Sequence, residues 1–317
     1  MRVLVTGASG YIGGQTALQL KDQGYEVHGI DWARLPEHLK ALDIFKDFCQ
    51  FDIDSFESRM HIKTIQPDAI IHCAGTSLVG PSMMNPEEYY NNNFVKTKSL
   101  LDYLRSLDWQ GRFIFSSSAA TYGNPVMTPI SEVDPADPIS PYGQSKLMID
   151  WLLESYCRAY QLNFVSFRYF NACGADSRAR HGQAPGATHI IARVLEAMRD
   201  KTTFTLNGTD YPTEDGTCVR DYVHVEDLAQ AHIMAMDSSI PTGIYNLGTK
   251  SGTSNTQIID IARVVTKQTI TVETGPQREG DPAILTADPE KFMSVSSWRP
   301  EHDLYDIISH AWAWYNR

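Results

Sequence analysis

The sequence predicts an α/β fold in which a doubly wound parallel sheet carries a smaller C-terminal α/β lobe. Short apolar runs typical of buried parallel strands alternate, along the first half of the chain, with stretches of helical periodicity. A glycine-rich turn directly follows the first apolar run, and the acidic residue Asp31 ends the second. This order is typical of a sheet that binds a dinucleotide at the carboxyl ends of its strands. We expect a dinucleotide-binding domain over residues 1–170 and a substrate-binding lobe over 171–317, interleaved through a returning segment near 222–248.

The first expected strand, residues 2–6, leads into the turn Gly7-Ala8-Ser9-Gly10-Tyr11-Ile12-Gly13. Glycines at its first, fourth and seventh positions allow a tight turn, a close approach of ligand to backbone, and close packing of the helix expected over 16–23. The unpaired amide groups at such a helix start suit a pyrophosphate. The residues predicted to bind it are Gly7, Gly10, Tyr11, Ile12 and Gly13.

Asp31 lies twenty-odd residues beyond the turn, the distance at which such units place an acidic residue. Its carboxylate would accept hydrogen bonds from ribose hydroxyls and would repel a 2′-phosphate. The sequence therefore predicts NAD as the cofactor rather than NADP.

The next two strand ends are expected to complete the cofactor site. A third strand is expected to end at residues 51–53, where Asp52, next to Ile53, could meet the adenine amino group. A fourth, expected over 68–73, ends in Ala74-Gly75, whose small side chains would let the chain pass close to the cofactor.

A phenol, an ammonium and a hydroxyl follow at a spacing that suits proton transfer. Tyr142 and Lys146 are four residues apart, so on a helix that starts near Tyr142 they share one face. A neighbouring ammonium favours the anionic form of a phenol, and a lowered pKa would make Tyr142 a general base near neutral pH. Ser118, at the carboxyl end of a strand, could bind the same substrate hydroxyl. The predicted catalytic residues are Ser118, Tyr142 and Lys146.

Beyond Arg168-Tyr169-Phe170-Asn171 the pattern loosens into glycines, prolines and short segments, as expected of a lobe built from loops. Arg220 and Arg278 could bind a diphosphate there by bidentate guanidinium contacts. The elements expected are a strand over 218–225, a helix from 226, a strand over 244–248 and a closing helix over 305–315.

The composition and net charge of the chain disfavour several classes of partner. The 317 residues, 42% of them hydrophobic, suffice for a large core. A net charge of -11 and a pI near 5.3 disfavour nucleic acid and anionic membranes.

The five cysteines lack metal-ligand spacing, so we expect neither a disulfide framework nor a bound metal. With no signal peptide and no apolar run of membrane-spanning length, a cytoplasmic location is expected. Helices expected over 87–107 and 144–160 could pack in a homodimer.

Ten segments, in order over nearly the whole chain, carry the motifs of a known family. They are GASGYIGGQT, DFCQFDI, IHCAG, YYNNN, FIFSSSAATYG, SPYGQSK, RYFNACGAD, DYPTEDGTCVRDYVHVEDLA, YNLGTKSG and REGDPAILTADPEK. With them the chain resembles the extended short-chain dehydrogenase/reductase family and, within it, the branch that epimerises UDP-hexoses at C4. The loop DYPTEDGTCVRDY is the most selective of the ten, whereas the glycine turn and YGQSK are shared by every relative.

The resemblance implies a Rossmann fold, bound NAD, and epimerisation of UDP-glucose or UDP-galactose through a 4-keto sugar. Tyr142 would take the proton of the 4-hydroxyl, Lys146 would hold the nicotinamide ribose, and Ser118 would bond to the reacting oxygen. Asn93 and Asn171 would orient the sugar and diphosphate. The cofactor contacts so implied include Asn93, Ser116 and Tyr169, and the substrate contacts include Phe170, Asn171, His189, Arg220, Arg278 and Asp281.

The sequence departs from the family pattern at three places. Thr76-Ser77 stands where a lysine often follows the Ala-Gly pair, and Asn207 stands where an aromatic residue often covers the uracil. Leu285 stands where a tyrosine crowds the 2-substituent of the sugar in some members, and this smaller wall would admit N-acetylhexosamines.

Four other functions were weighed against this one. A 4,6-dehydratase needs an acidic pair where this chain has Ala119 and Ala120, so elimination lacks its acid and base. Epimerases of UDP-N-acetylglucosamine, UDP-glucuronate or UDP-pentoses share the catalytic trio, and they stay open alternatives. A non-catalytic dinucleotide sensor is disfavoured because all three catalytic residues are present, and a reductase with exchangeable NADPH is disfavoured by Asp31.

Overall fold

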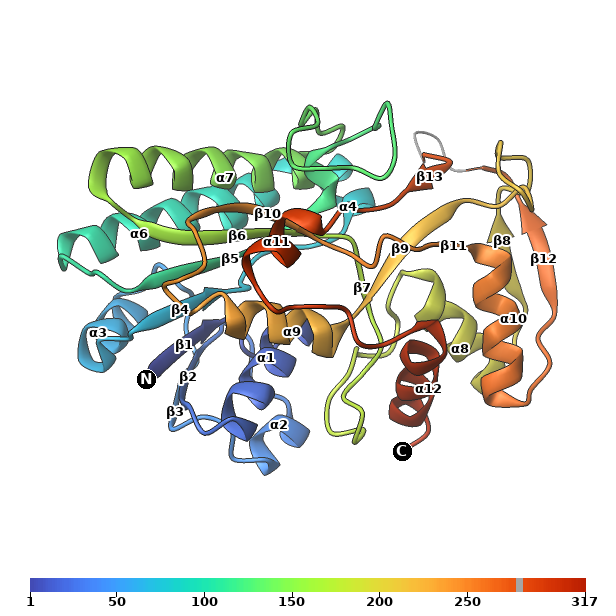
Figure 1. Ribbon diagram of the computed structural model, residues 1–317. Coiled ribbons are helices and arrows are strands. Elements are labelled where there is room, and N and C mark those ends of the chain that lie inside the picture. Colours follow the sequence, from blue (N-terminus) through green and yellow to red (C-terminus); the bar gives the residue numbers. More distant parts are fainter. Residues whose placement is uncertain (278–281) are drawn as a thin grey trace.

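The computed structural model describes residues 1–277 and 282–317, and at its centre lies a seven-stranded sheet. The strand order is β10-β6-β5-β4-β1-β2-β3, and each described pairing between neighbours is parallel (Figure 1). The predicted α/β class with a doubly wound parallel sheet is therefore confirmed. The order reverses between β1 and β4, which is where such sheets bind ligands. The strands span Arg2–Thr6 (β1), Glu26–Ile30 (β2), Asp47–Cys49 (β3), Ala69–His72 (β4), Arg112–Ser118 (β5), Asn163–Tyr169 (β6) and Gly243–Leu247 (β10).

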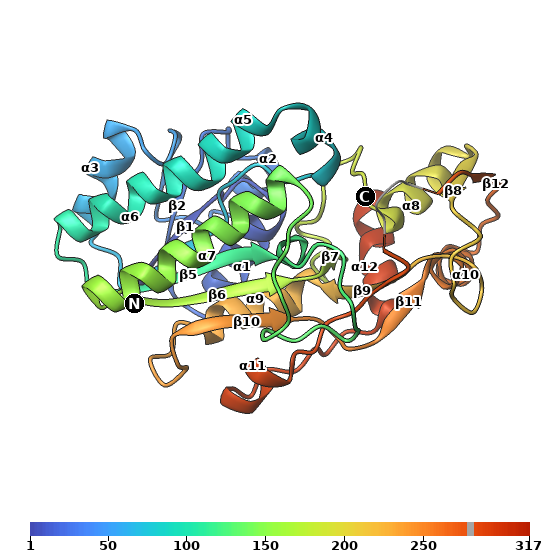
Figure 2. The ribbon, with the colours of Figure 1, turned by 90° about the horizontal axis from the view of Figure 1, so that it is seen from above.

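Helices cover both faces of this sheet, because alternate residues of each strand point to opposite sides. Val3 and Val5 of β1 pack in one apolar cluster with residues of α1 and α9, whereas Leu4 packs in a second cluster on the opposite face. Figures 1 and 2 show α1 and α9 on one side of the sheet and α6 and α7 side by side on the other. The covering helices are α1 (Tyr11–Asp22), α3 (Phe56–Ile65), α6 (Lys96–Ser106), α7 (Pro141–Tyr160) and α9 (Val225–Met234).

The helix expected over 87–107 is interrupted by a wide turn. It consists of α5 (Pro86–Tyr89), the π-helical segment η1 (Tyr90–Val95) and α6. A π turn inserts an extra residue into the helical path, and such turns are frequent at functional sites. Here the turn carries Asn93, which is buried.

Three predicted boundaries are wrong. The third strand ends at Cys49 and not at 51–53, because the carbonyl of Asp52 already accepts from the amide of Ser55, the residue that caps α3. Helix α1 begins at Tyr11 and not at residue 16. Helix α7 begins at Pro141 and not at residue 144, since Ser140 caps it and proline suits a first helical position.

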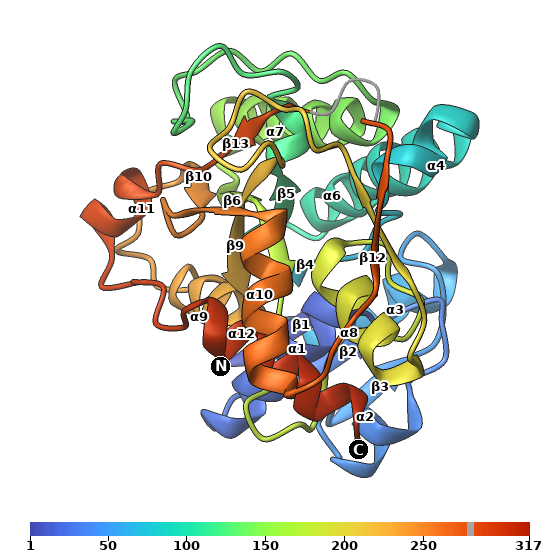
Figure 3. The same ribbon diagram turned by 90° about the vertical axis from the view of Figure 1, so that its right-hand side faces the viewer.

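The C-terminal lobe has its own small sheets and its own apolar cluster (Figure 3). Strand β9 pairs there with β7, β11 and β13, while β8 pairs with β12. The segment expected to return to the central sheet is thus divided, because β9 stays in the lobe whereas α9 and β10 join the central layers. The strands are β7 (Asn171–Cys173), β8 (Phe204–Asn207), β9 (Val219–His224), β11 (Gly252–Ser254), β12 (Val272–Gly275) and β13 (Ile284–Leu285), and the helices are α8 (Ile190–Asp200), α10 (Asn255–Thr266) and α12 (Leu304–Tyr315).

Four short helices complete the fold, and within 1–277 and 282–317 no helix combines the length and apolar character needed to cross a membrane. The short helices are α2 (Glu37–Ala41), α4 (Val79–Met84), the 3-10 turn η2 (Ala119–Thr121) and α11 (Glu290–Val295).

Candidate active site

The turn between β1 and α1 needs its glycines for steric reasons. Gly7 has a φ of 69°, and a Cβ atom there would lie 2.6 Å from the amide nitrogen of Ala74. A Cβ atom on Gly13 would lie 2.2 Å from the carbonyl oxygen of Gly7. Gly10 is exposed, and no described side chain caps the start of α1 beside it. The first amide groups of α1 are therefore presented as an anion-binding helix start.

Asp31 lies beside this turn at the carboxyl end of β2. Its carboxylate accepts hydrogen bonds from the backbone amides of Ser9 and Ala33, each 2.9 Å long. The side chain is largely buried, and burial raises its pKa while these two hydrogen bonds oppose the rise. The carboxylate is thus fixed next to the first turn of α1, as the spacing of Asp31 from the glycine turn predicts.

The other residues predicted to contact the adenosine are already engaged within the protein. The Asp52 carboxylate forms an ion pair with the Lys96 ammonium. Ile53 is buried and packs with Ile30 in the apolar core. The phenol of Tyr11 donates to the carbonyl of Gly174 over 2.8 Å, so that residue ties the glycine turn to the C-terminal half of the chain.

Asn93 connects the end of β4 to helix α7. Its Oδ1 accepts from the amide of Thr76 at 2.7 Å, and its Nδ2 donates to the Thr76 carbonyl at 3.0 Å and to the Ser145 hydroxyl at 2.9 Å. A Cβ atom on Gly75 would lie 2.8 Å from Asn93 Oδ1 and 3.6 Å from Lys146 Nζ. The small residues after β4 therefore let three predicted site residues converge.

The three predicted catalytic residues lie together where β5 ends and α7 begins. Ser118 is the last residue of β5, and its side chain is near enough to Tyr142, in the first turn of α7, to act on the pKa of the phenol. Lys146, one turn further along α7, is buried, and its Nζ donates to the carbonyl of Ser116 at 2.9 Å. The same Nζ lies 4.8 Å from the centre of the Phe115 ring.

The expected lowering of the pKa of Tyr142 by Lys146 is wrong for the protein residues taken alone. Burial raises the pKa of Tyr142 above its usual value, although the hydrogen bond with Ser118 opposes the rise. Burial also lowers the pKa of Lys146 to about 8. Lys146 therefore loses its charge before the phenol titrates, and a neutral amine cannot favour a phenolate.

Sequence reasoning missed His232, which contacts Ser116, the residue whose carbonyl accepts from Lys146. Its Nδ1 lies 2.7 Å from the Leu228 carbonyl, which can only accept, so Nδ1 carries the ring proton. Its Nε2 is then the acceptor for the Ser116 hydroxyl, 3.0 Å away. The Ser116 hydroxyl also lies 3.1 Å from the Cys73 sulfur. The contact between His232 and Ser116 spans 116 positions in the chain, so no local motif signals it.

The predicted substrate residues are spread over the border of the lobe. Phe170 is buried in a small apolar cluster with Ala119, and Leu285 packs against that cluster. The side-chain amide of Asn171 donates to the carbonyl of Asp221 at 3.1 Å. These contacts place Phe170 and Leu285 next to the residue that follows Ser118.

The remaining predicted substrate residues belong to the C-terminal half. His189 caps the start of α8, hydrogen-bonds to Gln183, and has its pKa lowered to about 4 by burial. Arg220 is largely buried in β9, and its guanidinium donates to the carbonyl of Val219 at 2.8 Å. Arg278 and Asp281 lie outside the described residues.

Comparisons with known proteins agree with this arrangement. The model of the NAD dependent epimerase/dehydratase family matches residues 3–248. The UDP-glucose 4-epimerase of Halalkalibacterium halodurans is 41% identical, with 99% of this chain and 96% of the relative covered. The structure of UDP-glucose 4-epimerase from Brucella ovis in complex with NAD has a TM-score of 0.93 at 38% identity, covering 98% and 97% of the two chains. That of the Bifidobacterium longum enzyme in complex with NAD+ and UDP has a TM-score of 0.90 at 31% identity, covering 99% and 98%. The resemblance found in the motifs is confirmed, and the chain belongs to the NAD dependent epimerase/dehydratase family.

Proposed function

We propose that the protein is an NAD-dependent isomerase that interconverts UDP-glucose and UDP-galactose at C4. The observation that carries the proposal is the convergence of Ser118, at the end of β5, with Tyr142 and buried Lys146 on α7, where Nζ of Lys146 lies 6.0 Å from the centre of the Tyr142 ring. This group lies at the carboxyl ends of the central strands, the edge that also carries the uncapped start of α1. The names of the relatives support the same activity.

The described residues fit NAD. The first amide groups of α1 suit a pyrophosphate, and the fixed carboxylate of Asp31 suits a ribose with free hydroxyls. The backbone of Ala74, just after β4, lies close to Gly7, so the end of this strand runs beside the turn. Bound NAD would supply the hydride chemistry, taking hydrogen from C4 and returning it to the opposite face of the sugar. The residues proposed for its binding are Gly7, Gly10, Tyr11, Ile12, Gly13, Asp31, Asp52, Ile53, Ala74, Gly75, Asn93, Ser116, Tyr142, Lys146 and Tyr169.

Tyr142 would act as the general base and later as the general acid at the 4-oxygen. Ser118 opposes the rise in the pKa of the phenol and can hydrogen-bond to the reacting oxygen. With a pKa of about 8, Lys146 is mostly protonated at neutral pH, and its ammonium stabilises negative charge that develops on the phenol. Ser116 fixes that ammonium through its carbonyl. The proton transfer thus depends on Lys146 remaining protonated while Tyr142 gives up its phenolic proton.

The other substrate contacts follow the family pattern. We propose that Phe170, Asn171, His189 and Arg220 contact the nucleotide sugar, together with Arg278 and Asp281. Asn93 would contribute by holding the Thr76 backbone against α7. Ala119 and Ala120 form the turn η2 directly after Ser118, where a dehydratase would need its acidic pair.

A second candidate activity is C4 epimerisation of UDP-N-acetylhexosamines. Leu285 packs on the cluster that contains Phe170 and Ala119, next to Ser118. A leucine lacks the hydroxyphenyl bulk of a tyrosine and leaves more room for a 2-acetamido group. The relative rates with the two substrate types would decide between the activities.

We also propose a homodimer that works in the cytoplasm. The helices α6 and α7 expose apolar side chains, with Val95 50%, Trp151 56% and Tyr160 53% exposed at or beside them. A reducing compartment is supported by the free thiols of Cys49, Cys73, Cys157 and Cys173.

The function is tested by incubating the purified protein separately with UDP-glucose, UDP-N-acetylglucosamine, UDP-glucuronate and UDP-xylose, and separating the products by chromatography. We expect UDP-galactose from UDP-glucose without added cofactor, because the cofactor ends each turnover unchanged. Denaturing the protein should release NAD in nearly equimolar amount. A protein that purifies without dinucleotide and ignores added NAD would contradict the proposal.

A further inference from the structure

A second cluster of chemically capable side chains lies away from the Tyr142 site. It is formed by the end of β9, the first turn of α9, the chain leading into α12 and α12 itself. Each of its four members offers one ligand atom, and all four atoms lie within 4.8 Å of one another. The members are His224, Glu226, His302 and His310.

The distances within this cluster match those between the ligands of one metal ion. The Nε2 of His302 lies 3.3 Å from Oε2 of Glu226, and the ligand atoms of all four residues lie within 4.8 Å of one another. Around Zn²⁺, bonds of about 2.0–2.1 Å put tetrahedral ligands roughly 3.4 Å apart. Imidazoles with one carboxylate are a donor set that zinc and neighbouring transition metals favour.

Asp227 orients His302 in the way seen around metal-binding histidines. Its Oδ1 lies 2.8 Å from Nδ1 of His302, and its Oδ2 accepts from the backbone amide of the same residue at 3.2 Å. A carboxylate on one ring nitrogen fixes the ring and raises the basicity of the other nitrogen, which faces Glu226. Glu226 is held in turn by the amide and the hydroxyl of Ser177. The supporting contacts of a metal site are therefore present.

His224 differs from the other three members. Its ring stacks on that of His302 at 4.1 Å, but its Nδ1 accepts from the amide of Glu226 at 3.0 Å. Its proton therefore sits on Nε2 and is donated to Nδ1 of His310, 3.0 Å away. His224 could ligate only if that proton moved and the amide lost its acceptor, whereas a metal ion at Nδ1 of His310 would displace this one hydrogen bond. The minimal ligand set is Glu226, His302 and His310, which leaves further coordination positions for water.

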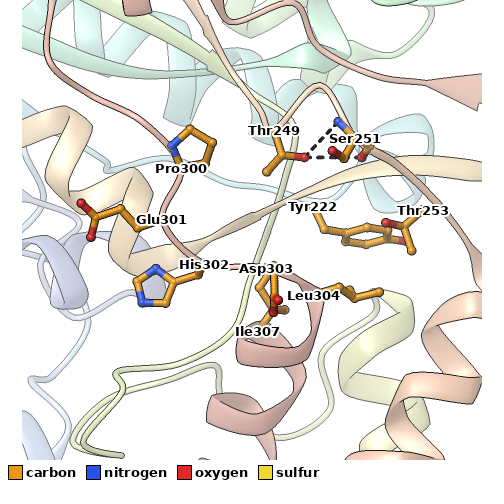
Figure 4. Close-up of a pocket in the computed structure, with 10 residues that line it drawn as sticks. All are labelled: Tyr222, Thr249, Ser251, Thr253, Pro300, Glu301, His302, Asp303, Leu304 and Ile307. Carbon is orange, nitrogen blue, oxygen red and sulfur yellow. Dashed lines mark hydrogen bonds between the residues drawn. The ribbon is translucent and has the colours of Figure 1, made fainter.

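A polar pocket borders the cluster at His302. The pocket measures about 280 Å³, and its lining includes His302 with the acidic neighbours Glu301 and Asp303 (Figure 4). Figure 4 shows these three on the stretch of chain that enters α12. Carboxylates at an entrance attract cations, and the net charge of -11 acts in the same direction.

We propose that Glu226, His302 and His310 form a binding site for a divalent transition-metal cation of the zinc type, separate from the nucleotide-sugar site. The ion would displace the ring proton that His302 shares with Glu226. It would join the chain before α12 and α12 itself to the start of α9, since the ligands come from these segments. Helix α9 packs against α1, so the site would stabilise the junction between the central layers and the lobe.

The test uses the full-length protein, treated with a chelator, dialysed, and titrated with Zn²⁺ in competition with a chromophoric chelator. We expect one saturable ion per chain, and a visible absorption spectrum of a four- or five-coordinate ion when Co²⁺ replaces Zn²⁺. His302→Gln and His310→Gln should each weaken zinc binding at least tenfold. The matched control is His61→Gln, because His61 belongs to the other histidine–carboxylate cluster of the described chain, with His28 and Asp47. This control should bind zinc like the parent protein.

Melting curves of each variant show whether it folds, and His310→Gln keeps the test valid if His302→Gln unfolds through loss of its contacts to Asp227. The proposal is overturned if zinc does not bind saturably. It is also overturned if His310→Gln binds as the parent does, or if His61→Gln removes the ion. The epimerase assay is independent of all three results, so the metal site and the proposed activity can fail separately.

Discussion

The Nζ atom of Lys146 lies 6.0 Å from the centre of the Tyr142 ring, and its described hydrogen bond goes to a backbone carbonyl instead of the phenol. The ammonium therefore acts on the phenol through space. Burial raises the pKa of Tyr142, and only a charged ammonium can oppose this effect by favouring the phenolate. Lys146 can thus support the proton transfer only in its protonated form.

The first prediction concerns Tyr142. Tyr142→Phe removes the group that takes the proton, so we expect kcat for UDP-glucose to fall by about 10²- to 10⁴-fold while NAD stays bound. The control is Tyr89→Phe, because Tyr89 lies edge-on to Tyr142 at 6.3 Å and its phenol donates to the carbonyl of Ser77. The control should lose about 1 kcal/mol of stability and little activity. Equal activity in Tyr142→Phe and the parent protein would remove Tyr142 from the mechanism.

The second prediction concerns the choice of cofactor. Asp31→Ala removes the carboxylate that faces the expected ribose, and hydrogen bonds to a charged group contribute about 1.5–3 kcal/mol. We expect NAD to bind about 10- to 100-fold more weakly and the preference over NADP to disappear, as measured by calorimetry of the dinucleotide-free protein. The control is Asp22→Ala, at the far end of α1, where Asp22 pairs with Arg180. Unchanged discrimination in Asp31→Ala would show that other residues select the cofactor.

Local sequence signals predicted the parts of the fold that local chemistry determines. The glycines of the first turn are required by contacts with their immediate surroundings, and their spacing is enough to recognise them. Strands β1 and β4 appear as apolar runs because both faces of the sheet are covered. The same reasoning placed Tyr142 and Lys146 on one helix face.

The rest depends on contacts between distant parts of the chain. The ion pair of Asp52 with Lys96 spans 44 positions, and no sequence pattern around Asp52 indicates it. The π turn that carries Asn93 has an ordinary helical sequence on both sides. The pKa of Tyr142 was predicted in the wrong direction because burial, which dominates it, cannot be seen in the spacing of two residues.

The third prediction concerns acid stability. His72 is fully buried between the hydroxyls of Thr6 and Thr97, and burial lowers its pKa to about 3. Since an exposed histidine titrates near 6.5, the unfolded chain binds more protons between about pH 6.5 and pH 3. Stability is therefore complete above pH 6.5 and falls as the pH drops, by up to about 1.4 kcal/mol per unit for this residue.

Urea unfolding at pH 7.5 and pH 5 measures this loss. His72→Gln should be less stable at pH 7.5, because its two hydroxyl partners are poorly satisfied, yet it should lose about 2 kcal/mol less than the parent between the two pH values. His232, whose pKa is lowered to about 4, keeps part of the acid sensitivity in the variant. An identical loss in both proteins would mean that His72 is not neutral in the folded state.

The fourth prediction concerns assembly. Trp151 belongs to α7 and is 56% exposed. Helix α7 lies in the same layer as α6 (Figure 2). If this layer is the dimer interface, Trp151→Glu places two carboxylates in an apolar contact and should convert a dimer, about twice the 35.6 kDa chain mass, into a monomer. Light scattering after size-exclusion chromatography measures the mass. Trp32→Glu is the matched control, because Trp32 is 76% exposed and follows β2 instead of lying on α7. A parent protein that elutes as a monomer would contradict the proposed dimer. A Trp151→Glu variant that stays dimeric would show that the interface lies elsewhere.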